Sequence, residues 1–222
     1  MARLTFYGHA CFLFEKNGIK LLFDPFLSGN PQATVAADEV EADYIFVSHA
    51  HADHLGDTYE IAARTDAKII STAEIAHECQ NRGLNAHAMH IGGKFKFEFG
   101  YVRVTPAFHG SGISGGHACG FIVNLDGFTI YFAGDTGLFG DMKLFGEIEK
   151  IDLFLVPIGG NFTMDLDDAV YATKLTGTGT VVPCHYNTWP VVAADPDEFC
   201  TKVSDNTAGR CLVLAPGESA DF

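Results

Sequence analysis

The stretch of sequence that decides the fold is YIFVSHAHADH, from Tyr44 to His54. It begins with an apolar run that predicts a buried strand, and it ends with three histidines and one aspartate in the spacing H-x-H-x-D-H. Side chains alternate along an extended chain, so His49 and His51 are expected to point the same way. Asp53 and His54 are expected where the chain turns into a helix. Two offset groups of ligands at one strand end indicate a site for two cations.

Four further polar residues stand in a similar setting, where an apolar run ends: Asp24, His109, Asp135 and His185. Each one alone is better explained as a turn aspartate or as a hydrogen-bonded buried histidine. Taken together with the H-x-H-x-D-H stretch, they supply the donors that two metal ions need, at the strand ends where α/β architectures gather their site residues. Imidazole and carboxylate donors without thiolate favour Zn²⁺, and Mn²⁺ or Fe accept the same donors.

Strand and helix patterns alternate along the 222 residues. Two hairpins are predicted around Asn17-Gly18 and Asp126-Gly127, joining 4–14 to 19–23 and 119–125 to 128–133. Other strands are expected at 44–48, 68–71, 94–99 with 102–105, 153–157, 180–184 and 211–215, and helices at 58–64, 73–82, 141–150, 166–175 and 197–203. Two stacked sheets with helices on their outer faces accommodate this order in a single domain, residues 1–222, of the α/β class.

Composition limits the classes of function. The chain has 14 Lys and Arg against 28 Asp and Glu, a net charge of −14, which disfavours a nucleic-acid surface. No apolar run is long enough to span a membrane, and the N-terminus does not read as a signal peptide. The six cysteines lack a metal-binding spacing and several lie in apolar runs, so free buried thiols in a cytoplasmic protein are expected.

On these residues the sequence resembles the metallo-β-lactamase-fold hydrolases, over essentially the whole chain. The five motifs of that fold occur in order, namely Asp24; His49, His51, Asp53 and His54; His109; Asp135; and His185. The resemblance implies an αββα sandwich of two mixed sheets and two divalent metal ions. It implies the following ligands: His49, His51 and His109 for one metal, Asp53, His54 and His185 for the second, and Asp135 bridging the two. Asp24 would support the ligand loop without touching metal.

A narrower resemblance lies in the stretches GHACF (8–12), DPF (24–26), PIGGNFTM (157–164) and HYNTWP (185–190). They are similar to a compact prokaryotic branch of these hydrolases, related to L-ascorbate-6-phosphate lactonase and N-acyl phosphatidylethanolamine phospholipase D. His9 is expected in mid-strand, within an otherwise apolar run. In that branch its position faces the active site, although a hydrogen-bonded core histidine is the open alternative. The resemblance suggests four pocket-lining residues: Asn161, Thr163, Asn187 and Trp189. Simple packing remains an alternative for Trp189.

The sequence therefore predicts a metal-dependent hydrolase that cleaves an ester, lactone or phosphodiester bond of a small metabolite. Hydroxide activated by two metals is the expected nucleophile, with Asp53, Asp135 and His9 as catalytic groups. A di-iron redox enzyme and a non-enzymatic metal-binding module are the alternatives. Relatives of this kind tend to self-associate, so a homo-oligomer is expected by analogy. Surface or packing roles are expected for His77, His87 and His90, whereas His117 could touch the site.

Overall fold

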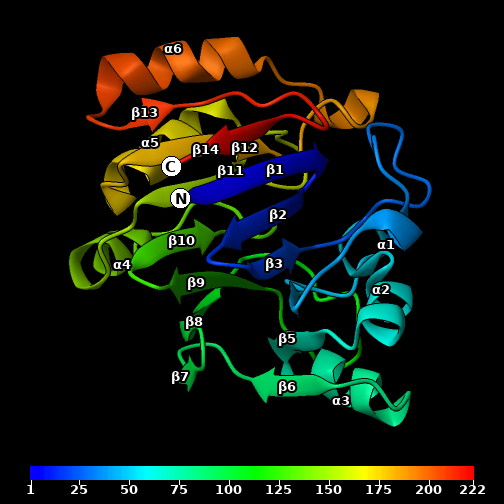
Figure 1. Ribbon diagram of the computed structural model, residues 1–222. Coiled ribbons are helices and arrows are strands. Elements are labelled where there is room, and N and C mark those ends of the chain that lie inside the picture. The colour runs from blue at the N-terminus through cyan, green and yellow to red at the C-terminus, as the bar shows by residue number, and fades with distance from the viewer. The chain divides into compact units, whose positions relative to one another are not determined.

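Two seven-stranded mixed sheets organise the chain in the computed structural model, which describes residues 1–222 (Figure 1). The chain divides into two units, each built on one of these sheets. The first unit comprises Met1–Gly93, Gly110–Cys119 and Leu214–Phe222, and the second comprises Lys94–His109 and Gly120–Val213. None of the helices is long and apolar enough to cross a membrane.

The sheet of the first unit has the strand order β14-β1-β2-β3-β4-β5-β6. Its strands are β1 (Ala2–Gly8), β2 (Cys11–Lys16), β3 (Ile19–Phe23), β4 (Tyr44–Phe46), β5 (Lys68–Thr72), β6 (Ala86–Met89) and β14 (Ser219–Asp221). Strands β14 to β3 pair antiparallel, whereas β3 to β6 pair parallel. The predicted turn between β2 and β3 is confirmed, since Asn17 and Gly18 both have positive φ.

Three α-helices and one short 3₁₀ helix belong to the first unit: α1 (Ala52–Leu55), α2 (Thr58–Thr65), α3 (Ala73–Asn81) and η1 (Ala37–Glu39). Helices α2 and α3 lie beside the β5–β6 part of the sheet (Figure 1). Ile61 of α2 and Ile75 of α3 pack with Ile45 and Ile69 of the neighbouring strands in one buried apolar cluster. The apolar face of each helix thus fixes the strand ends from which the polar residues project.

The sheet of the second unit has the order β13-β12-β11-β10-β9-β8-β7. Its strands are β7 (Lys94–Phe97), β8 (Gly100–Pro106), β9 (Cys119–Leu125), β10 (Phe128–Phe132), β11 (Leu153–Pro157), β12 (Thr180–Cys184) and β13 (Arg210–Cys211). Strands β10 to β13 are parallel, and β9 pairs antiparallel with β10 through the predicted Asp126-Gly127 turn. Strand β11 is fully buried, as its continuous apolar sequence predicts.

The helices of the second unit are α4 (Met142–Ile148), α5 (Leu166–Thr176), α6 (Pro196–Asn206) and the 3₁₀ helix η2 (Pro190–Val192). Side chains of α5 and α6, including Ala169 and Phe199, pack with Phe154 and Val181 of the sheet. Each of the two longer helices begins at an aspartate whose side chain accepts a backbone N–H of the first turn. These caps explain why the helices begin where they do.

Glu149, directly after α4, ties that helix to the edge of the sheet. Its carboxylate accepts hydrogen bonds from Lys94, Tyr101 and Arg103 at 2.6–3.0 Å, and its side chain is only 6% exposed. Burial acts to raise the pKa of Glu149, but the three hydrogen bonds outweigh that effect and lower it.

Three expectations from the sequence are wrong in detail. The run 4–14 is not continuous, because Gly8 and His9 have φ of +106° and +56° and reverse the chain between β1 and β2. His9 therefore lies in a tight turn and not in mid-strand. The strand expected at 211–215 is only the two residues of β13, and the sequence did not predict β6 and β14, which have too few residues to give a clear pattern.

The cysteines also differ from the expectation of six free thiols. Cys200 of α6 and Cys211 of β13 form a disulfide, with Cα atoms 5.1 Å apart. The pairing arises because β13 runs back along the end of α6, which the sequence spacing does not reveal. The other four cysteines are buried and are not disulfide-bonded, as expected.

Candidate metal centre

The first unit gathers six of the predicted site residues: His9, Asp24, His49, His51, Asp53 and His54. Asp24 directly follows β3, and the histidines at 49 and 51 follow β4, the parallel neighbour of β3. Asp53 and His54 lie on α1, as the sequence predicts. His9, Asp24, His49 and His54 are fully buried, whereas Asp53 has a side chain 27% exposed. Buried polar groups at adjacent strand ends need hydrogen-bond partners, and they find them in one another.

Asp24 is the centre of this network. Its Oδ1 accepts the backbone N–H of Ser48 at 2.7 Å, and its Oδ2 accepts the Ser48 hydroxyl at 2.5 Å. Oδ2 also lies 2.6 Å from Nδ1 of His54. Burial raises the pKa of Asp24, while the contacts with His54 and Ser48 act in the opposite direction. A carboxylate on Nδ1 fixes the tautomer of His54 and presents its Nε2 as the ligand atom.

The same hydroxyl orients His49. Ser48 Oγ gives its hydrogen to Asp24, so it accepts a hydrogen bond from Nδ1 of His49, which lies 2.9 Å away. Nε2 of His49 is then presented as a ligand atom, and it lies 2.9 Å from Nδ1 of His51. Through Ser48, one aspartate therefore sets the ring orientation of two histidines, and those rings lie with centroids 4.2 Å apart.

His9 reaches the same region from the β1–β2 turn. Its Nε2 lies 3.3 Å from Oδ2 of Asp53, and that oxygen is 3.9 Å from Nε2 of His54. The backbone N–H of His9 donates to Oε1 of Gln32 at 2.8 Å, which holds the left-handed turn in place. Gly8 is required there, since a Cβ on it would lie 2.7 Å from the Gln32 side chain.

The loop 110–116 closes over His51. The backbone N–H of Ala50 donates to the Ser111 carbonyl at 2.8 Å. Gly112 has φ of +68°, and a Cβ on it would lie 2.6 Å from the backbone nitrogen of His51. Only glycine permits this close approach, so the loop restricts the position of His51.

The second unit gathers the other three predicted ligands. His109, Asp135 and His185 follow β8, β10 and β12. Oδ2 of Asp135 lies 3.1 Å from Nε2 of His185 and 3.5 Å from Nε2 of His109. Asp135 and His185 are 3% and 2% exposed. One carboxylate oxygen thus faces two imidazole nitrogens, the arrangement expected of a shared ligand.

Thr136 links two of these strand ends. Its buried hydroxyl accepts the Phe108 N–H at 3.0 Å and donates to the Gly137 carbonyl at 2.7 Å. Phe108 precedes His109 and Thr136 follows Asp135, so this one hydroxyl holds the two ligand-bearing segments together. Thr136 is a site residue that sequence reasoning missed, and its place directly after Asp135 is the signal that could have found it.

The donor atoms within each unit fit a metal ion. Two ligands bonded at about 2.0–2.1 Å to one tetrahedral zinc lie about 3.3 Å apart. The four distances from a carboxylate oxygen to Nε2 of a histidine, two in each unit, range from 3.1 to 3.9 Å. All donors are nitrogen or oxygen, the set that zinc, manganese and iron accept.

Known proteins identify the family of the chain. Residues 3–185 match the model of the Beta-lactamase superfamily domain. The chain belongs to the β-lactamase superfamily. It is 50% identical over 220 residues to a "UPF0173 metal-dependent hydrolase" of Natranaerobius thermophilus, with 99% of each chain covered. A protein of the same name from Carboxydothermus hydrogenoformans is 50% identical over 227 residues, covering 97% of this chain and 98% of that one.

A solved structure supports the same assignment. Igni18, a metallo hydrolase from the archaeon Ignicoccus hospitalis, is 38% identical, with a TM-score of 0.94 over 100% of this chain and 99% of that one. The predicted fold class, two mixed sheets with helices in the metallo-β-lactamase fold, is therefore confirmed. The roles of the individual superfamily motifs, the single-domain organisation, cytoplasmic location and self-association stay predictions, as does the resemblance to the lactonase and phospholipase branch.

The four residues predicted to line the pocket all lie in the second unit. Asn161 and Thr163 follow β11, and Asn187 and Trp189 follow β12. Eight non-glycine residues have positive φ, and five of them are predicted site residues: His9, Asp24, Asn161, His185 and Asn187. Such conformations concentrate at functional sites. Among the other histidines, His77, His90 and His117 are exposed and His87 is partly buried on β6.

Proposed function

We propose that this protein is a metal-dependent hydrolase that uses two divalent metal ions, with zinc as the first choice. The single observation that carries the proposal is the position of Asp135, whose Oδ2 lies within 3.5 Å of imidazole nitrogens of both His109 and His185. Membership in a family of proteins named metal-dependent hydrolases supports it. The bond cleaved would be a carboxylic ester, a lactone or a phosphodiester of a small metabolite.

The proposed ligands are those that the family resemblance implies. They are His49, His51 and His109 for one ion, Asp53, His54 and His185 for the other, and Asp135 for both. In support, Ser48 holds Nδ1 of His49, and Asp24 holds Nδ1 of His54, so that Nε2 of each ring is available to a metal. Asp24 then supports the ligands without being one.

Bound divalent ions would lower the pKa of water and polarise the bond under attack. The protein's own groups would orient and move protons. Asp53, whose side chain is partly exposed, would take a proton from water, and Nε2 of His9, 3.3 Å from its Oδ2, would hold that carboxylate by a hydrogen bond. Asp135, almost fully buried, would keep its carboxylate fixed between His109 and His185.

The test combines metal content with turnover. Protein purified without added metal, then reconstituted with Zn²⁺, Mn²⁺ or Fe, is assayed on generic phosphodiester, lactone and thioester substrates. We expect up to two ions per chain and hydrolysis that a chelator abolishes. His51→Ala removes one of the two imidazoles of the His49–His51 pair and should abolish the activity. His77→Ala, which changes an exposed histidine on α3, should have the activity of the wild type.

Three outcomes would contradict the proposal. Hydrolysis at the full rate by a metal-free protein would show that the reaction does not need a metal. Two bound irons with a visible absorbance band and no hydrolysis would favour a redox enzyme. Two bound ions without any turnover across the substrate panel would leave a metal-binding module.

A further inference from the structure

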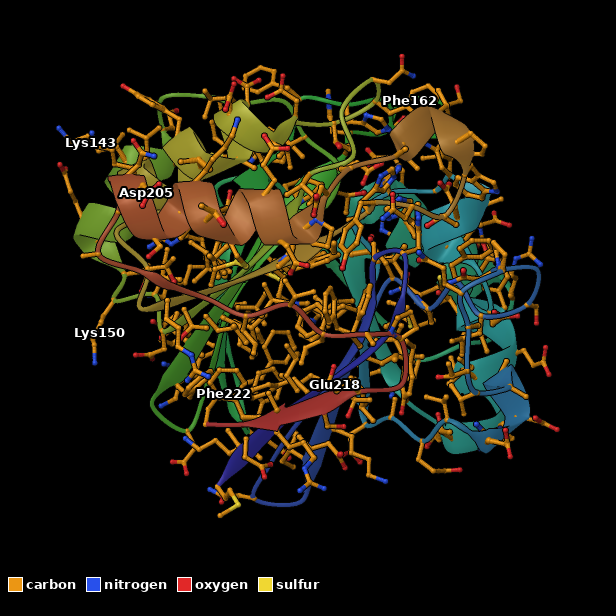
Figure 2. All side chains as sticks on the ribbon, turned by 90° about the horizontal axis from the view of Figure 1, so that it is seen from above. Lys143, Lys150, Phe162, Asp205, Glu218 and Phe222 are labelled. Atoms are coloured by element: carbon orange, nitrogen blue, oxygen red, sulfur yellow. A yellow bond between two sulfur atoms is a disulfide. The ribbon has the colours of Figure 1, made fainter.

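Large apolar side chains are exposed on the loops that follow β8, β11 and β12, and two of these loops carry metal-ligand candidates of the second unit. Phe108, directly before His109, is 66% exposed. Phe162, in the loop after β11, is 54% exposed, and Figure 2 shows it projecting from that loop. Trp189 and Val191, after β12, are 37% and 52% exposed.

These loops share one edge of the sheet. Strands β10, β11 and β12 are parallel, and β9 is antiparallel to β10. The start of β8 at Gly100 lies against Asn124 at the end of β9, while Gly120 at the start of β9 lies against Thr105 at the end of β8. Strand β8 is therefore antiparallel to β9 and runs in the same direction as β10. The ends of β8, β10, β11 and β12 thus place the apolar residues at the edge that bears the three ligand candidates.

Cationic side chains are placed elsewhere. In the second unit, residues 107–109, 133–141, 158–165 and 185–195 contain no Lys or Arg, although the chain has fourteen. Lys143 and Lys150 lie at the opposite end of this unit from Phe162 (Figure 2). In the first unit, residues 24–43, 47–57 and 110–118 likewise contain neither residue type.

This distribution selects among the substrates of the proposed function. Proteins bind carboxylates and phosphates chiefly with Arg and Lys, and these loops offer neither. These loops carry carboxylates instead, among them Asp141, Asp165 and Asp195, which repel an anionic group on a substrate. Exposed aromatic side chains beside polar catalytic groups are typical of pockets for apolar ligands.

We propose that the substrate is an uncharged carboxylic ester or lactone with an apolar acyl or aromatic group that packs on Phe108, Phe162 and Trp189. The proposal rests on the hydrolase function above and narrows it, because it excludes metabolites that carry a free phosphate or carboxylate. An anionic lipid surface is disfavoured as the occupant by the net charge of −14.

The kinetic test compares matched esters. With the metal-reconstituted enzyme, kcat/KM for p-nitrophenyl acetate, butyrate and hexanoate should rise by up to about fourfold for each methylene buried. Mono-p-nitrophenyl glutarate, which ends in a carboxylate, should react at least tenfold more slowly than the butyrate. Phe162→Ala and Trp189→Ala should flatten the dependence of kcat/KM on acyl chain length. Phe108→Ala should have the same effect, and the metal content of this variant is measured because Phe108 directly precedes His109. Phe95→Ala, an exposed phenylalanine on β7, should keep the wild-type slope.

A second readout does not need turnover. Trp189 is the only tryptophan of the chain, so its fluorescence reports ligand binding at this edge directly. N-hexylacetamide, a neutral amide, should shift the emission to the blue and bind more tightly than N-butylacetamide. 6-Acetamidohexanoate, of similar length with a terminal carboxylate, should bind at least tenfold more weakly. Phe162→Ala should weaken the binding of the neutral amide, and Phe95→Ala should not.

The outcomes separate this inference from the function beneath it. Hydrolysis without chain-length dependence, or equal binding of the charged and neutral amides, overturns the substrate class and leaves the hydrolase proposal intact. Amide binding as expected without hydrolysis of any ester removes the hydrolase proposal and keeps the apolar ligand site. A Trp189 emission that depends on protein concentration without ligand, with a dimer that Phe162→Ala dissociates, makes the patch a contact between copies of the chain and overturns the inference.

Discussion

Asp24→Asn replaces one carboxylate oxygen by an amide at the point where three groups meet. The asparagine can keep its Oδ1 on the Ser48 N–H, which Asp24 accepts at 2.7 Å. Its amide nitrogen then faces the Ser48 hydroxyl and Nδ1 of His54, where the carboxylate accepted hydrogen bonds at 2.5 and 2.6 Å. The amide nitrogen is a donor and faces two other donors, the Ser48 hydroxyl and the N–H at Nδ1 of His54. The ring of His54 therefore takes the tautomer with hydrogen on Nε2, so that Nδ1 can accept. That tautomer cannot bind a metal through Nε2.

The magnitude follows from what is lost. Removing a partner that orients a ligating histidine costs about 10- to 100-fold in metal affinity. Two hydrogen bonds to a charged group contribute about 1.5–3 kcal/mol each to stability. Burial raises the pKa of Asp24, so the carboxylate already costs desolvation energy that a neutral asparagine avoids. We therefore expect the free energy of unfolding of the metal-free protein to fall by about 3 kcal/mol, which is the lower end of the range for the two hydrogen bonds together.

The assay is competition for Zn²⁺ with a chromophoric chelator, together with thermal unfolding of the metal-free protein and ¹⁵N chemical shifts that report the tautomer of His54. Asp57→Asn is the matched control in the same unit. Asp57 accepts the N–H groups of Leu27 and Ser28 and contacts no histidine in the network described above, so it should lower stability without changing metal affinity. Wild-type affinity in Asp24→Asn, or a His54 tautomer unchanged from the wild type, would refute the reasoning.

Three further predictions concern the second unit. Thr136→Val leaves the Phe108 N–H without its acceptor and should lower metal affinity about 10- to 100-fold, whereas Thr136→Ser should restore it in the same chelator competition. Replacing Cys200 and Cys211 by serine, or adding reductant, should lower the free energy of unfolding by about 3 kcal/mol in denaturant titrations, since the bridge spans 11 residues. Glu149→Gln should cost about 1.5–3 kcal/mol at pH 7. Because the folded pKa of Glu149 is lowered, its contribution is present above about pH 4.3 and is lost as the pH falls through the folded pKa; a pH-independent difference would contradict this.

The strand ends could be predicted because they combine two local signals. Short apolar runs such as 153–157 and 180–184 match β11 and β12 residue for residue, and the polar residue after each run is given by the sequence itself. The Asn17-Gly18 and Asp126-Gly127 turns need positive φ at both positions, which few other residue pairs adopt, and this fixed the hairpins.

Contacts between residues that are far apart in the sequence could not be predicted from local patterns. The turn at His9 depends on Gln32, 23 residues away, which accepts the His9 N–H and packs against Gly8. The disulfide depends on β13 returning beside α6, although both cysteines read as ordinary buried thiols. Thr136 acts through Phe108, which is distant in sequence. A period of two or 3.6 residues carries no information about such partners.

The placement of charge changes how the acidic composition should be understood. A net charge of −14 does not by itself say which ligands the protein avoids. Asp24, Asp53 and Asp135 are committed to the histidine clusters, so they are not free surface charge. The informative quantity is where the fourteen cations lie, and they leave the loops at the ligand-bearing strand ends to carboxylates and aromatic rings. In the proposed ester hydrolase, bound metal would polarise the ester carbonyl, and these loops would supply no Lys or Arg to hold a further anionic group of the substrate. The positions of Lys and Arg in the sequence would therefore limit the charge that the proposed substrate can carry.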